Sequence, residues 1–185
     1  MNERIVPSTI RKVYEGRIFT LQVETIALPK GGTLHAEIVR HPGSVVIVPI
    51  TATGEVILVR QYRHAIGRWA WELPAGSLKP GEDIHAAALR ECHEEIGLVA
   101  DSLEPLGAWY PTPGYCDELM NFFRATGLRP PRADEHAQQD EDEDIEAKAF
   151  SREELTKMLA AGEIVDLKTV AGLAVGVRSP RETPP

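Results

Sequence analysis

One helix carries the pattern that most constrains this chain. A helix is predicted between Asp83 and Gly97, because a Pro-Gly turn precedes it and glycine commonly ends helices. At 100° per residue, Glu91 and Glu95 lie about 40° apart around the axis, and Glu94 lies about 60° to the other side of Glu91. Like charges at this spacing weaken an isolated helix by roughly a few tenths of a kcal/mol per pair. The glutamate face therefore needs either solvent or a cation.

These two interpretations differ in chemistry. A solvated helix face is the simpler one, and Arg90 can offset only one of the three negative charges. A cation site would suit a hard ion such as Mg²⁺, which prefers carboxylate and carbonyl oxygens. Zinc is a poorer candidate, because no second histidine or thiolate is spaced to join the glutamates.

The residues around the helix extend the pattern. Gly76 is followed after five residues by Glu82, and after seven more by Arg90-Glu91-Cys92-His93-Glu94-Glu95-Ile96-Gly97-Leu98. This segment resembles the Nudix box, a loop-helix-loop signature. The resemblance implies an α+β protein, a Nudix-type α/β/α sandwich with a small N-terminal β-strand subdomain. It also implies an enzyme that uses divalent metal to cleave nucleoside diphosphates linked to another moiety.

The remaining segments predict strands and two further helices without strict βαβ alternation, which favours an α+β arrangement. Three parts are expected: residues 1–42 as an N-terminal β subdomain for dimerisation and substrate binding, 43–178 as the Nudix hydrolase domain, and 179–185 as a disordered tail. Two apolar runs at 44–50 and 56–61 predict a hairpin buried on both faces. Further strands are expected at 69–73, 103–109, 119–125 and 146–150, and capped helices at 152–161 and 167–177.

The negative charge is concentrated in one segment. The chain has a net charge of -8, and the stretch from Asp134 to Glu146 holds eight acids without a lysine or arginine, so the rest is neutral. Such a run is typical of a solvated, disordered loop, or else recruits cations. The acidic balance argues against nucleic-acid binding, because phosphate backbones are held mainly by lysine and arginine.

Several features predict a cytoplasmic protein. No apolar run reaches the roughly 18 to 20 residues that span a bilayer, and the first residues carry charge and Pro7 where a signal peptide would be apolar. Cys92 and Cys116 are the only cysteines, and both are expected to be reduced thiols. Cys92 should pack with the apolar side of the helix.

Segments flanking the box narrow the resemblance. Arg60-Gln61-Tyr62-Arg63, Trp71-Glu72-Leu73-Pro74-Ala75-Gly76 and the acidic segment 140–146 are similar to the ADP-ribose pyrophosphatase branch. This implies hydrolysis of ADP-ribose to AMP and ribose 5-phosphate by a homodimer whose N-terminal strands swap. Two alternatives stay open: a nucleoside diphosphate sugar hydrolase acting on GDP-mannose or ADP-glucose, and a non-catalytic module that senses such nucleotides.

The resemblance also implies roles for single residues. Mg²⁺, or Mn²⁺, would be held by Glu91, Glu95, Glu143 and the carbonyl of Ala75, with Glu82 as a supporting carboxylate. Catalytic roles fall to Glu141 as the general base, to Arg90, which would orient the glutamates, and to Glu94, which is also a further candidate metal ligand. Substrate contacts are predicted for Arg63, Trp71, Thr112, Pro113 and Glu118. An aromatic such as Trp71 has a second interpretation, as a core residue.

Overall fold

The computed structural model of the protein describes residues 6–132 and 145–177. Three sheets and three α-helices form in this part. The N-terminal sheet has the order β1-β2-β3, from β1 (Thr9–Glu15), β2 (Thr20–Ala27) and β3 (Thr33–Arg40). The central sheet has the order β7-β4-β9-β8, from β4 (Ser44–Pro49), β7 (Ala75–Ser77), β8 (Val99–Trp109) and β9 (Met120–Arg129). The third sheet has the order β10-β5-β6, from β5 (Val56–Arg63), β6 (Arg68–Glu72) and β10 (Glu146–Phe150).

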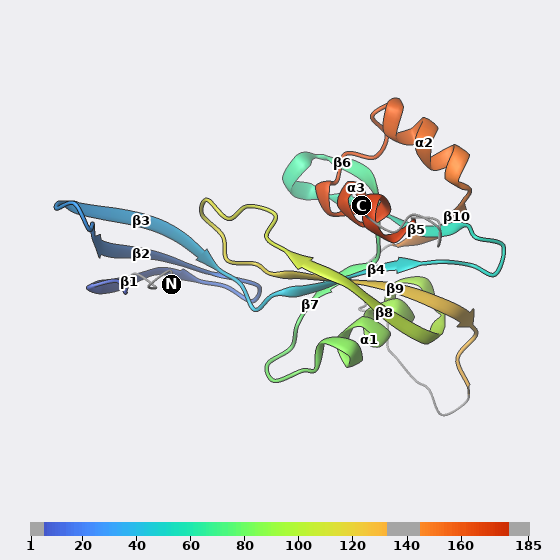
Figure 1. Ribbon diagram of the computed structural model, residues 1–185, viewed down its shortest axis with the longest axis horizontal. Helices are drawn as coiled ribbons and strands as arrows, with labels where there is room; N and C mark the ends of the chain where they lie inside the picture. Colours follow the sequence, from blue (N-terminus) through green and yellow to red (C-terminus); the bar gives the residue numbers. More distant parts are fainter. Residues whose placement is uncertain (1–5, 133–144, 178–185) are drawn as a thin grey trace, which may run out of the picture.

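The helices cover the two faces of the central sheet. Figure 1 shows α1 (Ile84–Ile96) on one side, and α2 (Arg152–Ala160), α3 (Leu167–Gly176) and the third sheet on the other. The N-terminal sheet projects from one end of this body. The predicted α+β sandwich is therefore confirmed. The predicted tail and most of the acidic run lie outside the described residues.

β4 lies between two hydrophobic cores and contributes side chains to both. Successive side chains of a strand point to opposite faces. Val45 and Ile47 join a cluster with Cys92 of α1, whereas Val46 and Val48 join a second cluster under α2 and α3. All four are fully buried, so the prediction of burial on both faces is confirmed for this strand. Burial raises the pKa of the Cys92 thiol to about 12.

The predicted hairpin of the two apolar runs is wrong. β4 and β5 meet at the isolated bridge between Ile50 and Val56, but then enter different sheets. β4 pairs with β7 through its first three residues on one edge and with β9 along its whole length on the other. β5 instead pairs with β6 and β10. An apolar strand pattern does not specify which strand becomes its neighbour.

The helices begin where the sequence predicts. Asp83 accepts hydrogen bonds from the first turn of α1, and Gly97 ends this helix with the positive φ angle of 69° that glycine adopts readily. Ser151 and Glu154 form a capping box at α2, and Asp166 caps α3. Both later helices end one residue before the predicted position. No helix in the described ranges is long and apolar enough to cross a membrane.

Candidate active site

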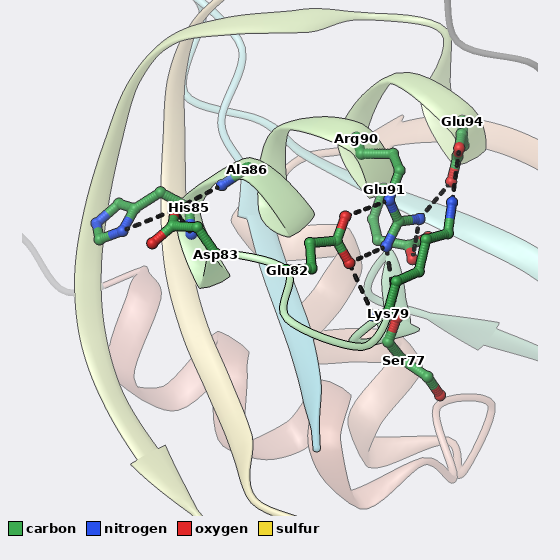
Figure 2. A network of polar contacts seen from close by, with 9 residues as sticks. All are labelled: Ser77, Lys79, Glu82, Asp83, His85, Ala86, Arg90, Glu91 and Glu94. Carbon is green, nitrogen blue, oxygen red and sulfur yellow. Dashed lines mark hydrogen bonds and ion pairs between the residues drawn. The ribbon is translucent and has the colours of Figure 1, made fainter. Parts of the chain in front are cut away.

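Arg90 organises the glutamates of α1. Its Nε and Nη2 donate to Glu82 at 2.7 and 3.0 Å, and its Nη1 donates to Glu91 Oε1 and Glu94 Oε2, both at 2.6 Å. Figure 2 shows the guanidinium between these carboxylates, with Lys79 reaching toward Glu94 from the loop before the helix. The hydrogen bonds, led by those to Glu82, raise the pKa of Arg90, so the guanidinium stays charged. The pairing predicted for Arg90 is observed.

Gly76 provides the space for the carboxylate of Glu91. A Cβ atom at position 76 would lie 2.0 Å from Glu91 Oε1 and 2.1 Å from its Cδ. Gly76 does not have a positive φ angle, so glycine is required here for space and not for backbone conformation. The absence of a side chain at Gly76 thus lets the buried Glu91 carboxylate lie against strand β7.

Glu95 is held by the same strand. The backbone N–H of Ala75 donates to Glu95 Oε2 at 3.1 Å. Glu91 and Glu95 are each only 8% exposed, an unusual position for carboxylates. Burying a negative charge is costly unless partners compensate it. The two glutamates therefore form a buried acidic pair beside β7, with Arg90 donating to Glu91 and the Ala75 N–H donating to Glu95.

A cleft of about 450 Å³ opens at this pair, a volume within the usual range for small-molecule sites. It is lined by four basic residues and three carboxylates: Arg17, Arg63, Lys79, Arg90, Glu91, Glu94 and Glu95. Arg17 and Lys79 were not predicted to be site residues. Lys79 lies within the Nudix box, so its position in the sequence could have indicated it. Arg17 lies in the β1–β2 turn, and only the fold brings it to the cleft.

Arg63 lies on the wall of the cleft but is already paired. Its Nε and Nη2 each donate to the Glu72 carboxylate at 2.8 Å, which is the parallel, two-bond geometry that guanidinium favours. Glu72 is 3% exposed, so the pair is shielded on that side. Among the described residues, Arg63 Nη1 has no hydrogen-bond partner. In this two-bond pair, Nη1 and the second N–H of Nη2 keep the capacity to donate to a ligand.

The other predicted substrate residues are placed apart from the cleft lining. Trp71 packs edge-on against Phe150 with ring centroids 4.9 Å apart, which agrees with its second interpretation as a core residue. Glu118 accepts a hydrogen bond from Ser44 at 2.9 Å. The carbonyl of Thr112 accepts bonds from the backbone N–H groups of two later residues in its loop. Within the described part of the chain, none of these residues, nor Pro113, lines the cleft.

The chemistry of the donors fits a hard divalent cation. Carboxylate and carbonyl oxygens are the ligands that Mg²⁺ prefers, and the glycine space at position 76 keeps the Glu91 carboxylate beside β7. In residues 6–132 and 145–177, however, no three acidic, histidine or cysteine side chains converge closely enough to hold an ion. Arg90 separates Glu91 from Glu94, and Glu95 accepts from Ala75. Two predicted participants, Glu141 and Glu143, lie outside the described residues.

The Nudix class of proteins is defined by an α/β/α sandwich with a cleft at a loop-helix-loop, here residues 76–98, whose helix carries clustered glutamates bonded to an arginine. The model of the NUDIX domain family matches residues 40–171, and the chain belongs to this family. The family resemblance predicted from the sequence is confirmed.

Known relatives agree with this assignment. The chain is 37% identical over 158 residues to an ADP-ribose pyrophosphatase of Bacillus subtilis, covering 85% of this chain and 84% of the relative. It is 36% identical over 159 residues to a methanol dehydrogenase activator of Bacillus methanolicus, covering 86% and 85%. A crystal structure of an ADP compounds hydrolase superposes with a TM-score of 0.79 at 24% identity, covering 94% of this chain and 92% of that one, and supports the fold.

Proposed function

We propose that the protein hydrolyses the diphosphate of ADP-ribose to AMP and ribose 5-phosphate with the help of Mg²⁺ or Mn²⁺. The observation that carries this proposal is the cleft in which two buried glutamates, Glu91 and Glu95, lie among four basic side chains. The similarity to the pyrophosphatase of Bacillus subtilis supports the choice of substrate. We place the activity in the cytoplasm, where the two free thiols of the chain would stay reduced.

The residues of the cleft and the acidic run would have different roles in hydrolysis. Glu91, Glu95 and the Ala75 carbonyl would hold a divalent ion, which neutralises phosphate charge and lowers the pKa of a bound water. Arg90 holds the carboxylates of Glu82, Glu91 and Glu94 in place through its hydrogen bonds. Arg63 and Lys79 offer positive charge to the diphosphate from the walls of the cleft. Glu141, as general base, would take the proton of the attacking water.

A panel of substrates tests this function. The purified protein should hydrolyse ADP-ribose in the presence of Mg²⁺ in preference to GDP-mannose and ADP-glucose, with AMP and ribose 5-phosphate as the products. Preference for either nucleotide sugar would select the alternative hydrolase function. Tight binding of ADP-ribose without turnover would select the sensing function, which the full set of box glutamates makes less favourable.

The acidic run supplies a prediction about the general base. Glu141→Gln should lower kcat by about 10²-fold or more, because a positioned base typically contributes this much, while Mg²⁺ binding stays nearly unchanged. Glu143→Gln, the matched change two residues away, should weaken Mg²⁺ binding instead. Steady-state kinetics at varied Mg²⁺ concentration separate the two effects. If Glu143→Gln shows the larger loss of kcat at saturating Mg²⁺, the two roles are exchanged.

We also propose a homodimer formed through the N-terminal sheet. Large apolar side chains of this sheet and its turns are 40 to 58% exposed: Ile10, Val13, Tyr14, Ile18, Phe19, Leu28 and Leu34. An apolar surface of this kind commonly marks a protein interface. The β1–β2 turn also reaches the cleft through Arg17 and Ile18, so a second copy bound at this sheet would lie near the substrate.

Leu34→Asp should therefore convert the dimer to a monomer in analytical ultracentrifugation, because a charge would be buried without a partner at the interface. The side chain of Leu34 is 46% exposed in the single chain, so the fold itself should tolerate aspartate. Leu167→Asp is the control, since this α3 residue is 62% exposed and lies far from the N-terminal sheet in the sequence. A monomeric unmodified protein would contradict the dimer.

A further inference from the structure

A buried carboxylate behind the cleft is shared by two cations. Glu72, at the end of β6, receives two hydrogen bonds from Arg63, and Lys168 of α3 donates to its Oε2 atom as well. Burial alone would raise the pKa of Glu72, but the hydrogen bonds and charges of Arg63 and Lys168 lower it below its usual value. Glu72 is therefore an anion, and Arg63 is not its only counter-ion.

Lys168 contacts Glu72 but does not line the cleft. Its side chain is 10% exposed, and it is not among the residues that line the cleft within the described part of the chain. Lys168 also donates to Asp166 at 3.0 Å, the residue that caps α3. The contact between Lys168 and the cleft thus runs through Glu72, which holds Arg63 on the cleft wall.

The start of α3 is fixed to the same strand end by a second bond. The hydroxyl of Thr169, which is fully buried, donates to Asp166 at 2.6 Å. The same hydroxyl accepts the backbone N–H of Leu73, the residue after Glu72, at 2.7 Å. Two adjacent residues of α3, Lys168 and Thr169, therefore hold two adjacent residues at the end of β6, Glu72 and Leu73. These bonds position Lys168 beside Glu72.

The charges of Lys168, Glu72 and Arg63 indicate how Lys168 would affect phosphate binding. Glu72 and a phosphate in the cleft are both anions, and both attract the one guanidinium of Arg63: Glu72 accepts from Nε and Nη2, and the phosphate would use the N–H groups that Glu72 does not use. Lys168 takes part of the charge of Glu72, so it weakens the attraction of Glu72 for Arg63 while keeping the carboxylate in place. Removing Lys168 would leave a buried carboxylate with Arg63 as its remaining strong partner, and Arg63 would then be drawn more tightly to Glu72.

We propose that Lys168 is a positioning residue for substrate binding, which acts through Glu72 to keep Arg63 available to the diphosphate. This inference rests on the proposed function, in which Arg63 contacts the diphosphate. It adds to that function a role for Lys168 of α3, which lies 96 positions after Glu72 in the sequence.

A double-mutant cycle tests the proposal. Lys168→Met should raise KM for ADP-ribose roughly tenfold while kcat changes less than about threefold, because binding common to the ground and transition states is lost. In the Arg63→Ala background, Lys168→Met should cause no further rise in KM, since residues that act through one another are not additive. Lys157→Met, which removes an exposed lysine-glutamate pair on α2, is the matched control and should leave KM unchanged.

The outcomes are distinct. An equal rise of KM in both backgrounds, or a lower melting temperature with unchanged KM, overturns the proposal. If Lys168→Met does not fold, Lys168→Gln can still donate to Glu72 and carries the same cycle with a smaller expected rise. If the unmodified protein prefers another nucleoside diphosphate derivative, the ADP-ribose function fails, and the cycle run on that substrate still decides the role of Lys168.

Discussion

Gly76→Ala is expected to lower kcat/KM by about 10²-fold or more, because misplacing a catalytic group by about 1 Å has an effect of this size. The added Cβ would overlap the Glu91 carboxylate, at 2.0 Å from Oε1. That carboxylate is at the end of a flexible side chain, so it can swing away at little cost to the fold. The melting temperature should therefore change little, and the loss should appear in activity.

Gly176→Ala provides the matched comparison. Its added Cβ would lie 2.8 Å from a methyl group of Val48 in the core, where the neighbours cannot move away easily. Overpacking of a core typically costs about 1–3 kcal/mol, so this variant should melt at a lower temperature while its folded molecules keep normal turnover. A Gly76→Ala variant that loses stability in the same way and keeps its activity would contradict the role of Gly76 in making space for Glu91.

Glu95→Gln is expected to lower kcat by about 10²- to 10³-fold, the range found when one charge-stabilising group is removed from an active site. Glutamine keeps the length of the side chain and an oxygen that can accept the Ala75 N–H, so the hydrogen bond at 3.1 Å can form again. It lacks the negative charge that would hold a divalent ion. Circular dichroism should show an unchanged fold, and calorimetric titration should show weaker Mg²⁺ binding.

Glu153→Gln is the control for this change. Glu153 is an exposed glutamate of α2, paired with Lys157 in solvent, and such pairs contribute little to stability. Its substitution should leave both kcat and Mg²⁺ affinity unchanged. Turnover by the Glu95 variant close to that of the unmodified protein would show that Glu95 does not hold the ion.

The local elements were predictable from the sequence because their signals are local. Asp83 and Gly97 bound α1 as capping chemistry predicts, and the segment 146–150 forms a strand with the predicted bounds. The pairing of β4 was not predictable. Its partners come from distant segments, and a continuous apolar run buried on both faces fits any neighbour that completes the sheet.

The candidate site was predictable to the same extent. The spacing of the box predicted Arg90 and the glutamates of α1 as site residues, because they lie on neighbouring turns of one helix. It did not indicate that Glu72 holds Arg63, because the partner strands β5 and β6 had first to be placed side by side. The contribution of Arg17 depends on how the N-terminal sheet lies against the body. Contacts between elements are decided by packing, which a single sequence does not display.

A crystal structure with Mg²⁺ and a non-hydrolysable ADP-ribose analogue would locate the ion and the diphosphate. We expect Mg²⁺ on the carboxylates of Glu91 and Glu95, with the diphosphate between the ion and Arg63 in the cleft of α1 and β7. Anomalous density from Mn²⁺ in place of Mg²⁺ would identify the ion without ambiguity. An analogue bound outside this cleft, or an ion held without either glutamate, would contradict the account.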